Sequence, residues 1–216
     1  MAAYTARITR VVDHGQETRS LFLERPAGLR FLPGQFLSCQ LPIDGARVTK
    51  PYTVASSPDV PGDLELLFNR VPGGAASHYL FERRDGDGLD FTGPWGTFTL
   101  EHALAAPTIF IAEGTGIAAI RPMVHRAAHT ATHPLHLLYA TRQPLYESEF
   151  ARLPGVTIDV IAPSTLPDVV AARWVTADDD RSRHFFVCGI GAIVHQLRDL
   201  LRGAGYARRA VHYEKW

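Results

Sequence analysis

Two glycines in the second half of the chain have the spacing of a phosphate-binding turn. Gly114 and Gly116 follow the apolar run 108–112 and precede a helix-like stretch over 117–128. Glycines let such a turn tighten and approach a pyrophosphate, whose negative charge is attracted by the free N–H groups of the following helix. The pattern G-x-G-x-x-A, which ends at Ala119, therefore predicts a dinucleotide site. An ordinary strand–helix turn that needs glycine for its backbone angles explains these residues equally well.

A second segment combines a cation, an aromatic ring and three hydroxyl groups within residues 50–58. Lys50 is suited to neutralising a phosphate, Tyr52 to stacking on a flat ring, and Thr53 to hydrogen-bonding a ring nitrogen. By themselves, these residues are more typical of an ordinary strand that ends in a Ser-Ser-Pro turn.

Three shorter segments also carry reactive or recognisable groups. Gly73–Ser77 precede a short amphipathic stretch, which suits a phosphate at a helix start but is more typical of a capped loop. Phe186–Gly189 form a strand-like run that ends in a thiol and a flexible residue. The chain ends on Trp216 directly after another strand-like segment, so its ring is expected either to pack on a partner group or to cap the surface.

These segments fall into two halves with different patterns. From residue 4 to about 100, short β segments are separated by turn residues such as Pro33-Gly34 and Pro61-Gly62, which favours a closed or sandwiched antiparallel sheet. Beyond Pro107, strand-like and helix-like runs alternate, as in a parallel α/β sheet. We therefore expect two domains, 1–103 and 104–216. The elements expected in the second are strands over 108–112, 135–139, 156–161, 185–188 and 210–214, and helices over 117–128, 145–153 and 192–202.

Composition excludes several classes of protein. The chain has 216 residues, of which 46% are hydrophobic, and it carries 22 basic and 22 acidic side chains. These values are ordinary for a globular protein, and no apolar run approaches the length of a membrane span. The balanced charge gives no case for a nucleic-acid partner. The N-terminus lacks the apolar region of a secretory signal. Two cysteines make a disulfide framework unlikely, so a reducing cytoplasm is the expected compartment.

The metal ligands in the sequence are too few or too scattered to make a site. Cys39 and Cys188 cannot by themselves hold an iron–sulfur cluster or a four-cysteine zinc ion. His125, His129 and His133 are spaced by four, but no glutamate completes a zinc motif. The sequence therefore predicts no metal site, and Cys39 is expected to be a small buried apolar residue.

Taken in order, these segments resemble the ferredoxin–NADP reductase superfamily, in its two-domain form without a ferredoxin domain. The resemblance runs from the strand at Gln35 to Trp216. It implies an N-terminal antiparallel six-stranded Greek-key barrel that binds flavin, followed by a parallel α/β domain that binds NAD(P)H. It also implies an enzyme that passes a hydride between NAD(P)H and FAD and then passes electrons to an acceptor protein.

The flavin residues implied by the resemblance lie in the first domain. Lys50–Thr53 are similar to the family's Arg-x-Tyr-Ser/Thr motif, with Lys where Arg is usual, so Tyr52 is expected to stack on the isoalloxazine and Thr53 to hydrogen-bond near N5. Gly73–Ser77 are similar to the segment that holds the flavin pyrophosphate, which favours FAD over FMN. The implied FAD-binding residues are Lys50, Pro51, Tyr52, Thr53, Val54, Ala55, Ser56, Gly73, Gly74, Ala76 and Ser77.

The second domain carries the implied dinucleotide motif. Its glycine turn resembles that of the family, with Glu113 where Gly is common and Ala119 where Pro is common. After the second expected strand of this domain, Arg142 is present and a ribose-binding carboxylate is missing, which slightly favours NADPH over NADH. The implied dinucleotide-binding residues are Gly114, Thr115, Gly116, Ile117 and Arg142.

The implied transfer site draws on three further segments. Cys188 and Gly189 resemble the family's pair beside the nicotinamide, and Glu214 resembles the acidic residue near the C-terminus. Trp216 resembles the terminal aromatic that covers the flavin in some members. Hydride chemistry belongs to the cofactors, so Thr53, Cys188 and Glu214 are expected to position the reacting rings and not to act as general acids.

The acceptor stays open at this point. The expected acceptor protein is a ferredoxin, a flavodoxin or an oxygenase component. Reduction of free flavin, or a non-catalytic role as a flavin- or nucleotide-binding sensor or docking subunit, are the alternatives.

Overall fold

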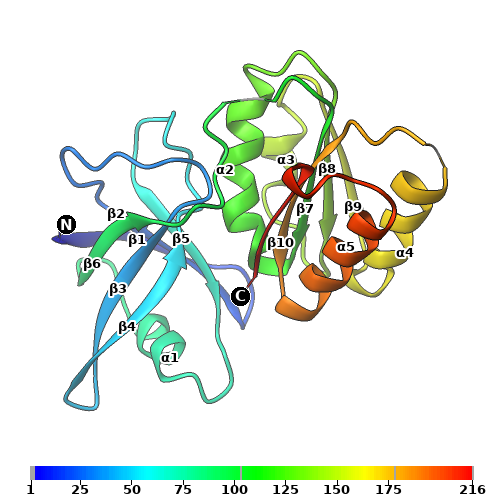
Figure 1. Cartoon of the computed structure of the whole chain (residues 1–216). Helices are drawn as coiled ribbons and strands as arrows, with labels where there is room; N and C mark the ends of the chain where they lie inside the picture. The colour runs from blue at the N-terminus through cyan, green and yellow to red at the C-terminus, as the bar shows by residue number, and fades with distance from the viewer. Residues whose placement is uncertain (1–2, 103, 178, 216) are drawn as a thin grey trace. The chain divides into compact units, whose positions relative to one another are not determined.

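The computed structural model describes residues 3–102, 104–177 and 179–215 (Figure 1). It divides into two compact units, and the division falls between Thr99 and Leu100. The expected role of Trp216 concerns a residue outside the described ranges. None of the described helices is long and apolar enough to cross a membrane.

The first unit is a six-stranded antiparallel sheet with the order β4-β3-β6-β1-β2-β5. An antiparallel bridge between Val54, just after β4, and Leu66 of β5 joins the two ends of this order, so the sheet curls into a barrel. The predicted Greek-key barrel is confirmed. Its elements are β1 (Ala3–Asp13), β2 (Thr18–Leu23), β3 (Phe36–Ile43), β4 (Ala46–Thr53), β5 (Leu64–Asn69), β6 (Gly88–Trp95) and the helix α1 (Ala75–Phe81).

The barrel core follows from the two-residue repeat of its strands. In β3, Leu37, Cys39 and Leu41 are fully buried while the residues between them are not. Cys39 is thus the small buried apolar residue that the sequence predicts. Leu80 and Phe81 of α1 join the same core, so the helix is held against the barrel by its apolar face.

The second unit is a five-stranded parallel sheet with the order β11-β10-β7-β8-β9. The predicted α/β class is confirmed. Its strands are β7 (Thr108–Glu113), β8 (Leu135–Ala140), β9 (Val156–Ile161), β10 (His184–Gly189) and β11 (Val211–Lys215), and its α-helices are α2 (Ile117–Ala128), α3 (Glu147–Phe150), α4 (Leu166–Ala171) and α5 (Gly191–Gly203). Short turns of other helix types are η1 (Gly114–Gly116), η2 (Pro163–Thr165), the π-helix η3 (Ala172–Thr176) and η4 (Arg208–Ala210).

Helices cover both faces of this sheet, with α2 on one face and α4 and α5 on the other (Figure 1). The odd-numbered core residues of β7 and β10, such as Ile109, Ile111 and Phe185, pack with α4 and α5. The even-numbered Phe110 and Phe186 stack on one another with ring centroids 5.6 Å apart. Because strand side chains alternate, this second set faces the α2 side.

Two expectations for the second unit are wrong. The helix expected over 145–153 is only the four-residue α3, since Tyr146 before it has a left-handed backbone (φ 63°) and Pro154 follows. The helical segment formed by α4 and η3 is missing from the predicted elements. Its prolines and β-branched residues weaken the sequence signal, and it forms because Leu166, Val170 and Trp174, spaced by four, are buried against the sheet.

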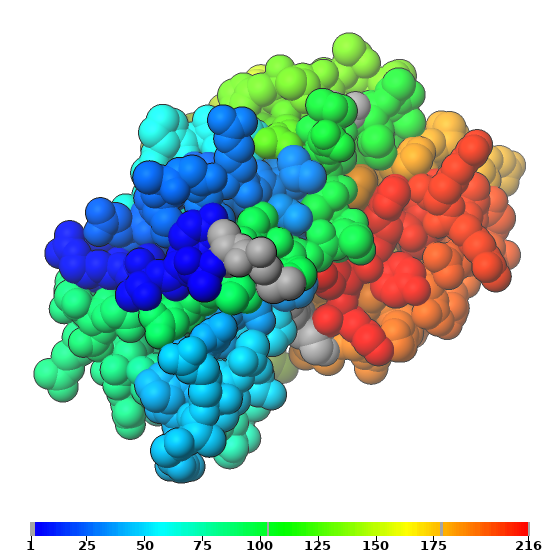
Figure 2. Space-filling view, turned by 60° about the vertical axis from the view of Figure 1, so that its left-hand side comes forward, coloured from blue at the N-terminus to red at the C-terminus, as the bar shows by residue number. Residues whose placement is uncertain are grey.

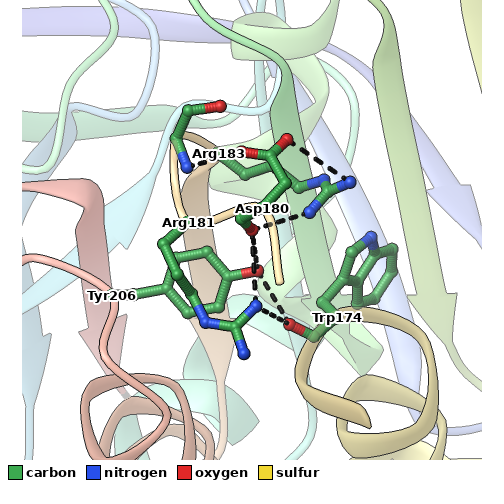
Figure 3. A network of polar contacts seen from close by, with 6 residues as sticks. Trp174, Asp180, Arg181, Arg183 and Tyr206 are labelled. Carbon is green, nitrogen blue, oxygen red and sulfur yellow. Dashed lines mark hydrogen bonds and ion pairs between the residues drawn. The ribbon is translucent and has the colours of Figure 1, made fainter. Parts of the chain in front are cut away.

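A polar network ties the end of this helical segment to the end of α5 (Figure 3). Arg181 donates from Nε to the Ala204 carbonyl at 2.7 Å and from Nη2 to the Val175 carbonyl at 3.2 Å. The Tyr206 hydroxyl donates to the Trp174 carbonyl at 2.7 Å. The last carbonyls of a helix lack partners within it, and a guanidinium both pairs with them and suits the negative end of the helix dipole.

We expect Arg181→Ala to lower the free energy of unfolding by about 2 kcal/mol, since carbonyls at two helix ends lose a charged donor. Urea denaturation followed by circular dichroism measures this, with Arg152→Ala, an exposed arginine of the same unit, as the control. Equal unfolding midpoints for the two variants would show that the network adds no stability.

Candidate functional site

In the first unit, Thr53 has a buried hydroxyl group without a hydrogen-bond partner. It is the last residue of β4, lies opposite Phe36 of β3, and is 3% exposed. Its Oγ1 atom is fully buried and forms no hydrogen bond. Such an atom costs about 1–3 kcal/mol unless something pairs with it. A nitrogen of a flavin ring is a suitable partner, so this residue fits the cofactor that the sequence predicts.

The backbone around Thr53 is fixed on the side that follows it. Val54 N–H donates to the Gln35 carbonyl at 3.1 Å, and Ala55 N–H donates to the Glu65 carbonyl at 2.7 Å. The Ser56 hydroxyl accepts the Glu65 N–H at 3.0 Å. The hydroxyl of Thr53 is therefore held by the same contacts that close the barrel.

The rest of the predicted flavin motif lies along β4. Lys50 and Pro51 are exposed, and Tyr52 is half-buried with its ring edge-on to Phe68 at 5.4 Å. Burial, together with the nearby Cys39 thiol, raises the pKa of Tyr52, so its phenol stays neutral. An exposed cation and a fixed neutral ring are thus separated by one residue on the strand that ends at Thr53.

The predicted pyrophosphate segment is a loop that leads into α1. Gly73 has a left-handed backbone (φ 71°), and a Cβ on Gly74 would lie 2.9 Å from Cβ of Val71. The Ser77 hydroxyl accepts the Val71 N–H and donates to the Gly74 carbonyl, both at 2.9 Å. Both glycines and Ser77 therefore shape this loop, and Ala76 packs on the barrel core behind it.

In the second unit, the two glycines after β7 serve different purposes. Gly114 has φ 53°, and no atom lies within 4 Å of where its side chain would be. A Cβ on Gly116 would lie 2.2 Å from the Cys188 carbonyl oxygen at the end of β10. Gly116 thus lets two turns touch, while Gly114 leaves open space in a turn at the start of α2. Thr115 is partly exposed in this turn, and Ile117 is buried.

Cys188 and Glu214 are neighbours at the carboxyl ends of β10 and β11. They are paired in the parallel register, and Cys188 is also paired with Ala112 of β7. Two residues earlier on the same strands, the rings of Phe186 and His212 stack with their centroids 4.4 Å apart. Because strand side chains alternate, Cys188 and Glu214 lie on the same face of the sheet as these two rings. The segment containing β11 lies at the molecular surface (Figure 2).

Like Thr53 in the first unit, Glu214 has a buried side-chain oxygen that fits a ligand. Its Oε2 is fully buried and forms no hydrogen bond, and burial raises the pKa of the carboxyl to about 7. The carboxyl is therefore divided between its neutral and charged forms near neutral pH. A ligand with a donor or a positive charge at this end of the sheet would stabilise the charged form.

Glu113 is a functional candidate whose role the sequence did not reveal. Its Oε2 accepts the Ile190 N–H at 3.0 Å, and Ile190 is the residue at the N-cap of α5. A Cβ on Gly189 would lie 2.7 Å from Cβ of Glu113. The carboxylate beside the glycine turn is therefore hydrogen-bonded to the turn that follows β10.

Arg142 follows β8 and is exposed. The segment after it is anchored by Glu149, which accepts from Arg121 at 2.6 and 2.8 Å and also pairs with His125. Burial would raise the pKa of Glu149, but these bonds lower it to about 2. His125, one of the three spaced histidines, thus has a carboxylate partner and belongs to an ion-pair cluster that fixes the loop beyond Arg142.

The structure brings some of the predicted residues together within each unit. In the first, the Lys50–Ser56 stretch is one strand and its exit. In the second, the glycine turn, Cys188, Gly189 and Glu214 meet at the carboxyl ends of three adjacent strands, which is where open α/β sheets bind ligands. Their roles stay predictions, because geometry alone does not name a ligand.

Comparison with known proteins decides the family. Residues 6–100 match a family described as an oxidoreductase FAD-binding domain. The chain is 31% identical to ferredoxin–NADP reductase B of Sorangium cellulosum over 239 aligned positions. The alignment covers 99% of this chain and 97% of that protein. This chain belongs to the ferredoxin–NADP reductase superfamily.

Further relatives agree with this placement. The reductase component of propane 2-monooxygenase from Rhodococcus jostii is 26% identical over 97% of this chain, and the chain spans 62% of that protein's length. A ferredoxin–NADP reductase from Neisseria gonorrhoeae, solved with FAD and NADP, has the same fold, with a TM-score of 0.84, 17% identity and coverage of 99% and 98% of the two chains. The predicted superfamily, fold class, FAD cofactor and NAD(P)H-dependent reductase activity are confirmed.

The raised pKa of Glu214 makes stability depend on pH in a defined direction. An acid whose pKa is higher in the folded state than its ordinary 4.5 binds its proton more tightly when folded, so its charged form destabilises the fold as pH rises. We expect Glu214→Gln to match the wild type near pH 4.5 and to become progressively more stable than it as pH rises through 7.

Thermal unfolding of both proteins between pH 4.5 and 8.5, without dinucleotide, measures the difference. Glu147→Gln, which removes an exposed carboxylate of α3, is the control. A constant difference between wild type and Glu214→Gln over this range would contradict the expectation.

Proposed function

We propose that the first unit holds FAD through residues 50–56 and 73–77, and that the second unit binds NAD(P)H at the carboxyl ends of β7, β10 and β11. The observation that carries the proposal is the meeting of the glycine turn, the Cys188–Gly189 pair and Glu214 at that sheet edge. The full-length similarity to the Sorangium reductase supports it. FAD, when bound, accepts the hydride and passes electrons on one or two at a time.

On the flavin side, the chain supplies orientation. Tyr52, held edge-on to Phe68, is suited to stacking on the ring, and the unpaired hydroxyl of Thr53 is suited to a hydrogen bond near N5. Lys50 is an exposed cation suited to the flavin phosphates, which it contacts as a point charge without the two-pronged geometry of arginine. The loop 73–77 presents its glycines to the pyrophosphate.

On the dinucleotide side, the open backbone at Gly114 suits the pyrophosphate. We assign Cys188, at the end of the adjacent β10, to the nicotinamide. Glu214 is buried beside Cys188, and its charged form favours the positively charged oxidised nicotinamide over the neutral reduced one. None of these side chains needs to transfer a proton to the reacting carbon, so they act as positioning groups.

Two finer points belong to the proposal. Arg142 is exposed after β8 and suits a 2′-phosphate, which favours NADPH. The electron acceptor is a separate redox protein, a ferredoxin, flavodoxin or oxygenase component, because the relatives include a ferredoxin reductase and an oxygenase reductase component. We place this reaction in the cytoplasm, without a nucleic-acid partner.

The direct test is the visible spectrum of the purified protein with FAD, followed by addition of NADH and of NADPH, separately and without oxygen. The expected result is that bound flavin is bleached by both dinucleotides, and at lower concentrations of NADPH than of NADH. A protein that binds FAD but bleaches with neither dinucleotide would contradict the reductase proposal. Rapid loss of FAD during gel filtration, with turnover of added flavin, would instead indicate reduction of free flavin.

The role of Thr53 has its own test, because the same change should act oppositely on the protein with and without FAD. Thr53→Val keeps the shape but removes the unpaired hydroxyl, so the cofactor-free protein should be as stable as the wild type or more so. Its FAD dissociation constant should rise about fivefold, which corresponds to one hydrogen bond.

Thermal unfolding without FAD and fluorescence titration with FAD measure these two effects. Thr49→Val, at an exposed position of the same strand, is the matched control. Unchanged FAD affinity in Thr53→Val would remove Thr53 from the flavin site.

A further inference from the structure

The side chain of Glu113 joins two turns that belong to different strand–helix units. Glu113 is the last residue of β7, and its Oε2 accepts the backbone N–H of Ile190 at 3.0 Å. Ile190 follows β10 and has an extended backbone (φ −66°, ψ 137°) at the N-cap of α5. Its N–H precedes the helix and has no helical acceptor of its own, so the carboxylate satisfies it.

Two glycines allow the same two turns to touch. A Cβ on Gly116 would lie 2.2 Å from the Cys188 carbonyl oxygen, and a Cβ on Gly189 would lie 2.7 Å from Cβ of Glu113. Real Cβ atoms do not approach other atoms so closely, so each position requires glycine as long as the other turn stays where it is. The backbone on both sides of the Cys188–Gly189 bond is thus confined by residues 113–116.

The charge of Glu113 is partly compensated within the fold. Burial raises the pKa of Glu113, and the hydrogen bond from Ile190 partly offsets this. The N-terminal end of α5 also carries the positive end of the helix dipole, which stabilises a carboxylate there. The carboxylate next to the proposed pyrophosphate-binding turn is therefore directed to the N-terminal end of α5, where Ile190 donates to it.

We propose that Glu113 is a positioning residue for hydride transfer. It fixes the Cys188–Gly189 backbone at one spacing from the turn 114–116, so that the nicotinamide and the pyrophosphate of one dinucleotide meet both turns at once. The inference rests on the proposed function, since it assigns one turn to the nicotinamide and the other to the pyrophosphate of NAD(P)H. The effect runs through the hydrogen bond to Ile190, so an uncharged acceptor at position 113 is sufficient.

The first test needs neither cofactor nor turnover. Hydrogen exchange at the Ile190 amide, measured by NMR on the FAD-free protein, should be faster in Glu113→Ala and close to the wild-type rate in Glu113→Gln, whose side-chain oxygen still accepts the bond. Gly189→Ala should also speed exchange, because its Cβ displaces Glu113. Asp168→Ala, an exposed carboxylate of α4, is the control.

The second test follows flavin reduction in the FAD-loaded proteins by rapid mixing with NADPH and NADH. In Glu113→Ala, the rate constant at saturating dinucleotide should fall by roughly ten- to a hundredfold, the scale of an ångström-sized misplacement. The long-wavelength charge-transfer absorption of the stacked rings should weaken in parallel. FAD affinity should be unchanged, and Glu113→Gln should restore both the rate and the absorption.

Each outcome decides between explanations. Wild-type exchange at Ile190 and wild-type reduction in Glu113→Ala would overturn the positioning role. Equal impairment of Glu113→Ala and Glu113→Gln would also overturn it, because charge and not the hydrogen bond would then matter. If the wild type itself binds FAD but is reduced by neither dinucleotide, the proposed function fails and this inference falls with it. If Glu113→Ala does not fold, Gly189→Ala and Glu113→Gln decide by their exchange rates alone.

Discussion

The close approach of the Cys188 carbonyl to Gly116 constrains the carboxyl end of the sheet in the second unit. It presses the turn after β7 against the end of β10, in a space where even one methyl group would lie 2.2 Å from the oxygen. The parallel register then places Cys188 beside Glu214 on the next strand. Three chain segments far apart in sequence therefore reach one sheet edge with little freedom, as the positioning of reacting rings requires. The contact therefore adds to the strand register a fixed position for the turn at residues 114–116.

Barrel closure has the corresponding role in the first unit. The bridge from Val54 to Leu66 and the backbone bonds of Val54 and Ala55 come directly after Thr53, so the hydroxyl is held by bonds that the fold itself needs. A flavin motif on the open middle of β4 alone would lack this support, since Lys50 and Pro51 are exposed. Its anchored end is therefore where orientation is most accurately defined.

Much of this arrangement is predictable from sequence because local rules and tertiary packing agree. The helix expected over 117–128 has the bounds of α2, and the glycine turn lies between strand and helix as the motif requires. The rest depends on contacts that sequence patterns do not encode. Prolines obscure the helical segment formed by α4 and η3, which is buried through Leu166, Val170 and Trp174. The motif predicts that Gly116 lets the turn approach a pyrophosphate, and it does not reveal that the missing side chain also makes room for another strand's carbonyl.

Two unpaired buried oxygens, one in each unit, share a physical meaning. Thr53 Oγ1 and Glu214 Oε2 each cost stability in the protein alone, and in a well-packed fold such costs are rarely kept without a compensating gain. Glu113 differs from both, because its carboxylate is hydrogen-bonded within the protein and so needs no ligand to satisfy it. The three residues thus divide the work. Two have no partner within the fold, and the third is hydrogen-bonded to the backbone that follows β10. A residue that departs from its family's usual glycine can therefore be explained by what it bonds within the fold, before any ligand is considered.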